Sequence, residues 1–446
     1  MNRFATPVEI KTLFALVLAS LLISSLAQRY LGHPGSGANV DFYVYYFAAQ
    51  AVHENPHADL YTGATTENPE FSLEAPAGSA VAAHAKAAGF NDVSFYVYPP
   101  LLADLLSPFS HLPPRLAAAL WRAFNLSLVL ASVLLLARML RLPVLSFEFV
   151  ALAVAAYSFW PVNEAVADGQ ITIVLFALWT VGVVAYSDGR VVLSAAAFAL
   201  ATALKVTPIL VLPLFLVWKD RRWLLSYLGV SLGLVSAMAA VNGLHTVAIY
   251  PTVMSTMGGG IPAMSNKSIG SLLTWIYCGR IFTIDAAQGV MPSLPRALAI
   301  AAKAISGVFY LVCLFLAWRN RHGLDRVSKT IAIAVFGLVI ACVSPVSWRN
   351  GYSAAFIVLA ILWVKALRTP PRILPAALLA LTTFTLGSLF FDLAAQGPLP
   401  QLCKILLAAT WIVFSVLFCL DTLFHADAGG RADIATDRSA AAAGAL

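Results

Sequence analysis

The chain has 446 residues, of which 60% are hydrophobic and 11% are charged, and its mean hydropathy is +0.82. A soluble domain carries about a quarter charged residues, so this composition excludes an ordinary soluble domain. The apolar runs are long and do not alternate with polar residues, which favours membrane-spanning helices over a membrane barrel. The net charge is +7, but no basic run has the pattern of a nucleic-acid arm, so we expect no nucleic-acid partner.

We expect an all-α polytopic membrane protein with about 12 transmembrane helices. The predicted spans are 9–27, 115–139, 146–161, 170–187, 191–204, 207–218, 223–241, 295–318, 328–345, 351–367, 372–391 and 399–424. The first is interpreted as an uncleaved helix and not as a signal peptide, because so many spans follow it. The fifth and sixth are shorter than the about 20 residues that a span needs. They predict a broken pair around Lys205, of the kind that lines a cavity.

The positions of Lys and Arg predict a topology with both termini in the cytoplasm. With that orientation, 17 of the 28 basic residues lie in short inner loops or at the termini. The two large segments, 29–114 and 242–294, then lie outside and are expected to contain interfacial helices. We interpret 1–425 as one integral membrane domain and 426–446, rich in Ala and Gly, as a disordered cytoplasmic tail.

Four of the five cysteines lie in apolar runs and none forms a C-x-x-C pair, so we expect free thiols. No D-x-D motif or histidine cluster is present, so we expect neither a metal nor another cofactor.

Under this topology, the polar residues that lack a trivial explanation share the outer face. Ionisable groups near membrane depth are costly, so they are candidates for function. These residues are Asp41, Tyr98, Glu164, Asp168, Gln170, Lys205, Asn266, Lys267, Ser268, Ser347, Trp348, Arg349 and Asn350.

Asp41 precedes an aromatic run, D-F-Y-V-Y-Y-F-A-A. In a helix, residues 42, 45, 46 and 49 share one face, which we expect to lie in the membrane interface. The simplest role for Asp41 is then to cap the start of that helix. A functional role in an outer-face site is the alternative.

The other candidates also have simple structural interpretations. Lys205 is either a snorkelling lysine or a phosphate partner. Gln170 can cap a helix start, and Asn266–Ser268 can be a loop that enters an amphipathic helix. The S-P-V-S-W segment that ends at Trp348 can be a kink followed by an interfacial tryptophan.

In combination and in order, these segments resemble glycosyltransferase family 87, membrane enzymes of the GT-C class. The matching segments are D-F-Y-V-Y-Y-F-A-A (41–49), L-Y (60–61), Y-P-P-L (98–101), L-P-P (112–114), G-Q-I-T (169–172), A-L-K-V-T-P (203–208), N-K-S-I (266–269) and S-P-V-S-W (344–348). The first, the Y-P-P and the S-P-V-S-W segments are the most specific. The resemblance implies a GT-C-type fold and an inverting glycosyltransferase with Asp41 as general base.

The resemblance also implies a polyprenyl-phosphate sugar donor, with mannose expected as the sugar, and a lipid or glycan acceptor. Lys205, Arg349 and Lys267 are the cations expected to bind the donor phosphate. The remaining substrate-site candidates are Tyr45, Tyr98, Gln170, Asn266, Ser268, Trp348 and Asn350. The expected location is the bacterial cytoplasmic membrane, among its lipids, with the site facing outward.

The chain departs from the family pattern at two positions. Asn350 stands where the family commonly has a histidine, with Arg349 beside it as a replacement cation. Thr172 stands where the family has an asparagine. The rival interpretations are a transporter or flippase of a lipid-linked sugar, and a ligase that uses a diphosphate-linked glycan.

The predicted topology is tested by single cysteines labelled from outside intact cells. Positions in 62–94 and 255–265 should react with an impermeant maleimide, because both ranges fall in outer segments. Positions in 319–326 should react only after the membrane is permeabilised. The reverse pattern would place the site on the cytoplasmic face.

Overall fold

The computed structural model describes residues 6–31, 40–62, 78–90, 93–256, 263, 265–281, 295–322, 324–369, 371–388 and 399–425. The predicted tail 426–446 lies outside the described residues, as does part of each large outer segment.

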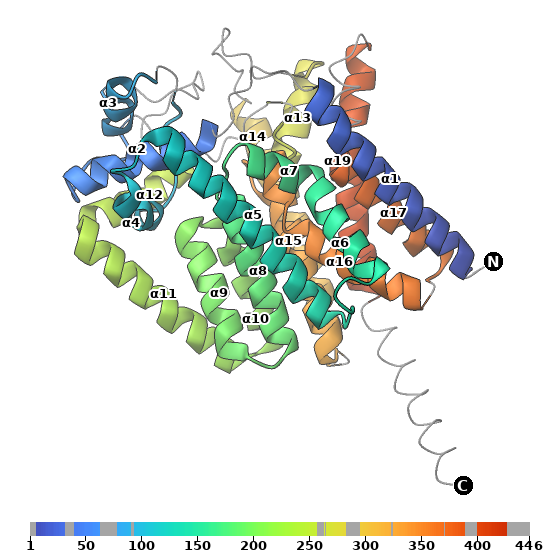
Figure 1. The fold of residues 1–446 in the computed structure, drawn as a ribbon. Helices are drawn as coiled ribbons and strands as arrows, with labels where there is room; N and C mark the ends of the chain where they lie inside the picture. The colour runs from blue at the N-terminus through green and yellow to red at the C-terminus, as the bar shows by residue number, and fades with distance from the viewer. Residues whose placement is uncertain are drawn as a thin grey trace.

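The described residues form helices joined by turns and contain no β-sheet (Figure 1). In chain order the helices are α1 (Pro7–Leu31), α2 (Val40–Glu54), α3 (Ala80–Ala87), α4 (Pro100–Leu106), η1 (Ser107–Phe109), α5 (Pro114–Met139), α6 (Phe147–Ser158), α7 (Trp160–Ala167), α8 (Thr172–Ser187), α9 (Val191–Leu204), η2 (Thr207–Val211), α10 (Leu212–Trp218), α11 (Arg221–Asn242), α12 (Leu244–Thr256), α13 (Ile269–Cys278), α14 (Arg296–Arg319), α15 (Arg326–Val343), η4 (Arg349–Tyr352), α16 (Ala355–Arg368), α17 (Ile373–Gly387) and α19 (Gln401–Phe424).

A helix occupies each of the twelve predicted spans, which confirms an all-helical membrane protein. Within the described residues, six helices are long and apolar enough to cross a membrane: α1, α5, α11, α14, α15 and α19. A seventh crossing is formed if α6 and α7, which meet at a 56° bend, count as one broken span. The remaining apolar helices are shorter, so the number twelve stays a prediction.

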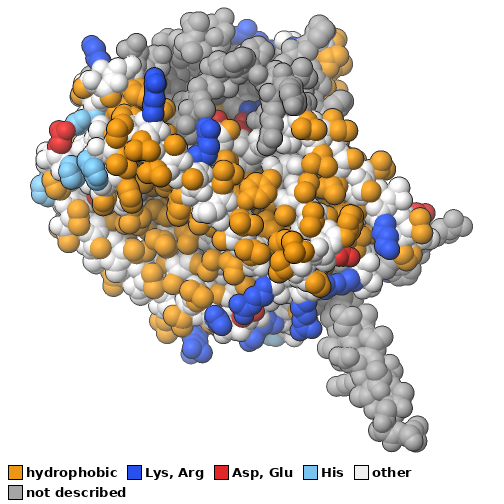
Figure 2. Space-filling view, in the orientation of Figure 1, with side chains coloured by type: hydrophobic (Ala, Val, Ile, Leu, Met, Phe, Trp, Pro, Cys, Tyr) orange, Lys and Arg blue, Asp and Glu red, His pale blue; other side chains and the backbone are white. Residues whose placement is uncertain are grey.

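The two ends of the molecule differ in structure and in charge. Helices α2, α3, α4 and α12 gather at the upper end in Figure 1, whereas the turns from α8 to α9 and from α10 to α11 lie at the lower end. Figure 2 shows an apolar band across the middle of this face and Lys and Arg side chains along its lower edge. This distribution is typical of a membrane protein with a cationic cytoplasmic edge.

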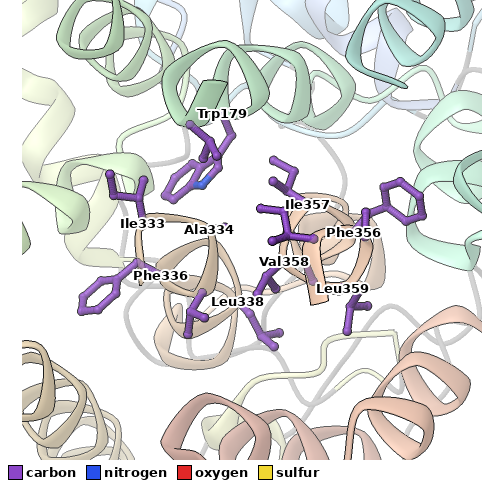
Figure 3. Close-up of a cluster of buried hydrophobic side chains, with 14 of the residues drawn as sticks. Trp179, Ile333, Ala334, Phe336, Leu338, Phe356, Ile357, Val358 and Leu359 are labelled. Atoms are coloured by element: carbon purple, nitrogen blue, oxygen red, sulfur yellow. The ribbon is translucent and has the colours of Figure 1, made fainter. Parts of the chain in front are cut away.

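Helix α15 forms the centre of the bundle. In the most apolar stretch of α15, 78% of the residues are buried inside the protein, whereas the corresponding share in the peripheral α11 is 11%. Ile333, Phe336 and Leu338 of α15 belong to the same apolar core as Trp179 of α8 and Phe356 of α16 (Figure 3). This core supports the helix ends that carry the candidate site.

Helices α8 and α9 pack closely because Gly182 has no side chain. A Cβ atom at this position would lie 2.5 Å from Cε2 of the buried Phe198 ring. The close packing places Lys205, at the end of α9, beside Thr172, at the start of α8. The predicted break is confirmed, because the backbone is extended at Lys205 (φ −155°, ψ 122°) before η2 begins at Thr207.

Candidate active site

The aromatic residues of α2 hold this helix inside the protein. Phe42, Tyr45, Tyr46 and Phe47 are each at most 3% exposed. They pack against α4, α5 and the Tyr96–Pro99 segment. The predicted interfacial position of this face is therefore wrong, because the segment from Tyr96 to Leu112 and helix α5 cover it.

Tyrosine hydroxyls connect this layer to backbone carbonyls. Tyr46 donates to the Ser110 carbonyl at 2.9 Å, and Tyr61 donates to the Tyr98 carbonyl at 2.8 Å. Tyr96 donates to the Pro99 carbonyl at 2.8 Å. A buried hydroxyl without a partner would be costly, so these bonds fix the segment around the Y-P-P motif against α2.

The turn after α7 meets the first turn of α2. Gly169 has φ +70°, which an L side chain rarely adopts, and this turns the chain sharply after Asp168. The Asp41 amide donates to the Asp168 carbonyl at 3.2 Å, and Trp121 Nε1 donates to the Gly169 carbonyl at 2.7 Å. Gln170 is thereby placed directly beside Asp41.

Asp41 lies in the first turn of α2, with its carboxylate turned toward Gln170. The Gln170 Nε2 group donates to Asp41 Oδ2, and the Tyr45 hydroxyl donates to Gln170 Oε1 at 3.1 Å. The hydroxyls of Tyr45 and Tyr98 lie 3.1 Å apart. The structure therefore brings four of the predicted site residues into one hydrogen-bonded group.

Burial and, to a lesser extent, neighbouring groups set the ionisation of Asp41. Burial raises the pKa of the Asp41 carboxyl to about 6, Glu164 adds to that rise, and Gln170 and the Lys205 ammonium oppose it. Asp168 also interacts electrostatically with Asp41 and with Glu164. The carboxyl is thus adjusted to accept a proton near neutral pH, as a general base requires.

Arg349 is bound by Glu164. Its Nη2 group donates to Glu164 Oε1, and its guanidinium lies 5.4 Å from the centre of the Trp160 ring. This pair joins η4 to α7, and the Glu164 carboxylate offsets much of the positive charge of Arg349. Arg349 is therefore less suited to a phosphate than the sequence alone suggests.

Lys205 differs from Arg349 in this respect. Among the residues that the structure describes, Lys205 forms no salt bridge. Its ammonium lies 6.0 Å from the centre of the Tyr98 ring and attracts the Asp41 carboxylate.

The 266–268 segment pairs with the loop before η4. Asn266 Nδ2 donates to the Pro345 carbonyl at 3.1 Å, and the Ser347 amide donates to Asn266 Oδ1 at 2.8 Å. The Lys267 amide donates to the Ser347 carbonyl at 2.8 Å. Asn266 thus joins two loops, a structural role that accounts for its complete burial.

Lys267 and Ser268 turn toward α13 and α19. The Lys267 ammonium lies 5.4 Å from the Trp411 ring and 5.9 Å from the Trp275 ring. The Ser268 hydroxyl accepts the Ser271 amide at 3.1 Å and so caps α13, which supports the structural alternative for this residue. The substrate roles of both residues stay predictions.

A cavity of about 60 Å³ lies between Lys205 and the loop before η4. Its wall includes Lys205, Ser347, Trp348, Thr172 and Trp179. Within the described part of the chain, Thr172 Oγ1 and Trp179 Nε1 are buried and have no hydrogen-bond partner. The cavity therefore presents a cation and two unused polar groups to a ligand.

Asn350 lies just outside this wall. Its carbonyl accepts the Ser353 hydroxyl at 2.7 Å, whereas its side-chain Oδ1 is buried with no partner among the described residues.

Sequence reasoning named Glu164 as a candidate without a partner, and it gave no role to Thr172 or Trp179. The family departure at Thr172 was a signal for that position. Trp179 lies inside an apolar run that conceals it.

Groups of three His, Cys, Asp or Glu placed to hold a metal ion are absent from the described residues, and the expected absence of a metal stays a prediction.

The candidate site is thus a partly exposed acid beside a lysine, at one end of the helix bundle. The sequence model of glycosyltransferase family 87 matches residues 96–345, more than half of the chain. The chain belongs to this family and is a membrane glycosyltransferase. The matched region contains Gln170 and Lys205 and begins after Asp41.

The chain is also similar to a characterised protein of Mycobacterium tuberculosis (strain CDC 1551 / Oshkosh). That protein is a polyprenol-phosphate-mannose-dependent alpha-(1-2)-phosphatidylinositol pentamannoside mannosyltransferase. The two are 26% identical over 358 residues, which cover 78% of this chain and 72% of the relative. Together with the family match, this similarity favours the enzyme over the transporter interpretation.

The Glu164–Arg349 pair should contribute to stability, because its side chains are only 12% and 15% exposed. Removing one partner of a buried pair costs about 3–5 kcal/mol. We expect Glu164→Gln and Arg349→Met each to lower the melting temperature in detergent. The double variant should recover part of that loss.

The measurement is a double-mutant cycle on thermal unfolding. A coupling free energy below about 0.5 kcal/mol would show that the two side chains act independently.

Proposed function

We propose that the protein is an inverting GT-C glycosyltransferase that moves a sugar, mannose, from a polyprenyl-phosphate donor to a lipid or glycan acceptor. The proposed reaction takes place at the outer face of the cytoplasmic membrane. The membrane domain is 1–425, with twelve spans. The name of the mycobacterial relative supports the donor and the sugar.

The observation that carries the proposal is the Asp41 carboxylate, partly exposed beside Lys205 and oriented by Gln170. A carboxylate whose pKa is near neutral can accept the proton of a hydroxyl, and a nearby cation can stabilise the leaving phosphate.

The proposed reaction is a single displacement. The acceptor oxygen attacks the anomeric carbon and its proton passes to Asp41. A new carbon–oxygen bond forms as the bond from that carbon to the phosphate oxygen breaks. Attack opposite the leaving group inverts the anomeric configuration. A second carboxylate to protonate the leaving group is unnecessary, because a phosphate already leaves well.

Lys205 is the proposed partner of the donor phosphate. It lines the cavity together with Trp348, and it has no carboxylate within salt-bridge distance among the described residues. The unpartnered groups of Thr172 and Trp179 in the same wall suit the polar part of the donor. Arg349 stays engaged with Glu164 during this step.

Asp41→Asn should abolish most of the transfer. The amide has nearly the same shape and still accepts a hydrogen bond, but it cannot take a proton. We expect the rate to fall about 10²–10⁴-fold. The assay supplies polyprenyl-phosphate mannose and extracted membrane lipids to the purified enzyme and detects labelled glycolipid.

Asp188→Asn is the matched control. Asp188 lies in the turn after α8, where its carboxylate lies 3.9 Å from Arg138 Nη2. This variant should retain transfer. Full activity of a folded Asp41→Asn protein would contradict the assignment of the base.

The pH profile gives an independent test. Because the pKa of Asp41 is raised to about 6, the group is ionised and active above that pH and protonated below it. We expect kcat/KM to fall about tenfold for each pH unit below this value. A profile that stays flat well below pH 6 would contradict Asp41 as base.

A further inference from the structure

Gln170 is placed to act on Asp41 and not on a substrate. Its side chain is buried, with only 3% exposed, and both ends of its amide are engaged. Nε2 donates to Asp41, and Oε1 accepts the Tyr45 hydroxyl. A ligand would have to break one of these bonds to reach the amide.

The backbone around Gln170 is held as firmly as its side chain. Asn125 Nδ2 lies 3.5 Å from the Gln170 carbonyl, and the Ile171 amide points to the Tyr45 hydroxyl at 3.4 Å. Trp121 and Asp41 bind the two preceding carbonyls. These contacts hold the amide with its oxygen at the Tyr45 hydroxyl, which is shared with Tyr98, and its nitrogen facing the Asp41 carboxylate.

We propose that Gln170 is a positioning residue that orients Asp41 Oδ2 and stabilises its ionised form, leaving Oδ1 for the acceptor hydroxyl. This inference rests on the proposed function and deepens it. It replaces the expectation from sequence that Gln170 contacts the substrate.

A hydrogen bond from a neutral donor stabilises a carboxylate more than the protonated acid. Gln170 thus acts with the Lys205 ammonium against burial and against the acid Glu164, while Asp168 has its own pKa raised by Asp41. The other titratable groups near Asp41 are Tyr45 and Tyr98, which stay neutral over the working pH range. Loss of the amide should therefore make Asp41 a base that requires a higher pH.

The experiment measures the pH dependence of mannose transfer from polyprenyl-phosphate mannose by Gln170→Leu. The acid limb of kcat/KM should move up by about one pH unit or more, because charge-assisted hydrogen bonds are among the stronger ones. The KM for the donor should stay within about twofold, because the amide does not touch the donor. Gln170→Glu should move the limb in the same direction, because it adds an acid beside Asp41.

Gln50→Leu is the matched control. Gln50 lies on α2, the helix that carries Asp41. Its side chain donates to the Tyr46 hydroxyl and to the Ser110 carbonyl, each at 3.1 Å, and not to Asp41. This variant makes the same chemical change and should leave the acid limb at the wild-type pH.

The possible outcomes separate the two proposals. An unmoved limb with lower yield of folded protein in Gln170→Leu would show a purely structural role and overturn the inference. A raised donor KM with an unmoved limb would show a substrate contact and also overturn it. A wild-type enzyme that transfers no sugar, or shows no acid limb, would instead contradict the proposed function.

Discussion

The contact between the 168–171 turn and the first turn of α2 is the interaction on which the candidate site depends. It joins α2 to the bent α6–α7 pair through the Asp41 amide, the Asp41 carboxylate and the Tyr45 hydroxyl. Gly169 makes this contact possible, since its positive φ turns Gln170 toward α2. Without this turn, the acid would have no partner that fixes its direction.

Much of the architecture follows from the sequence. Long apolar runs predicted where helices lie, because hydrocarbon requires every backbone polar group to be satisfied within the helix. The break at Lys205 also followed, from runs too short to span and from a proline after the lysine. The candidate role of Asp41 and of the residues around it was predicted from several motifs in their order along the chain. The spacing of any one motif did not distinguish a general base from a helix cap.

The sequence could not show which side chains already have partners. Arg349 and Lys205 are both cations near helix ends, yet among the described residues Glu164 forms a salt bridge only with Arg349. That difference depends on a contact across 185 residues of chain, which no local pattern encodes. The position of the aromatic residues of α2 was predicted wrongly for a related reason. Tyr and Phe suit a membrane interface and a protein core equally well, and only the packing of the Y-P-P segment decides between them.

The shortness of α9 has a consequence for how a lipid-borne sugar is handled. Its 14 residues rise about 21 Å, less than the about 30 Å of the hydrocarbon layer. If α9 starts near one surface, as Arg190 suggests, Lys205 stands below the opposite one. Under the proposed function, the donor's head group descends to the lysine while its isoprenoid chain stays dissolved among the lipids. The enzyme then has no need to extract the lipid, and only the sugar crosses from carrier to acceptor.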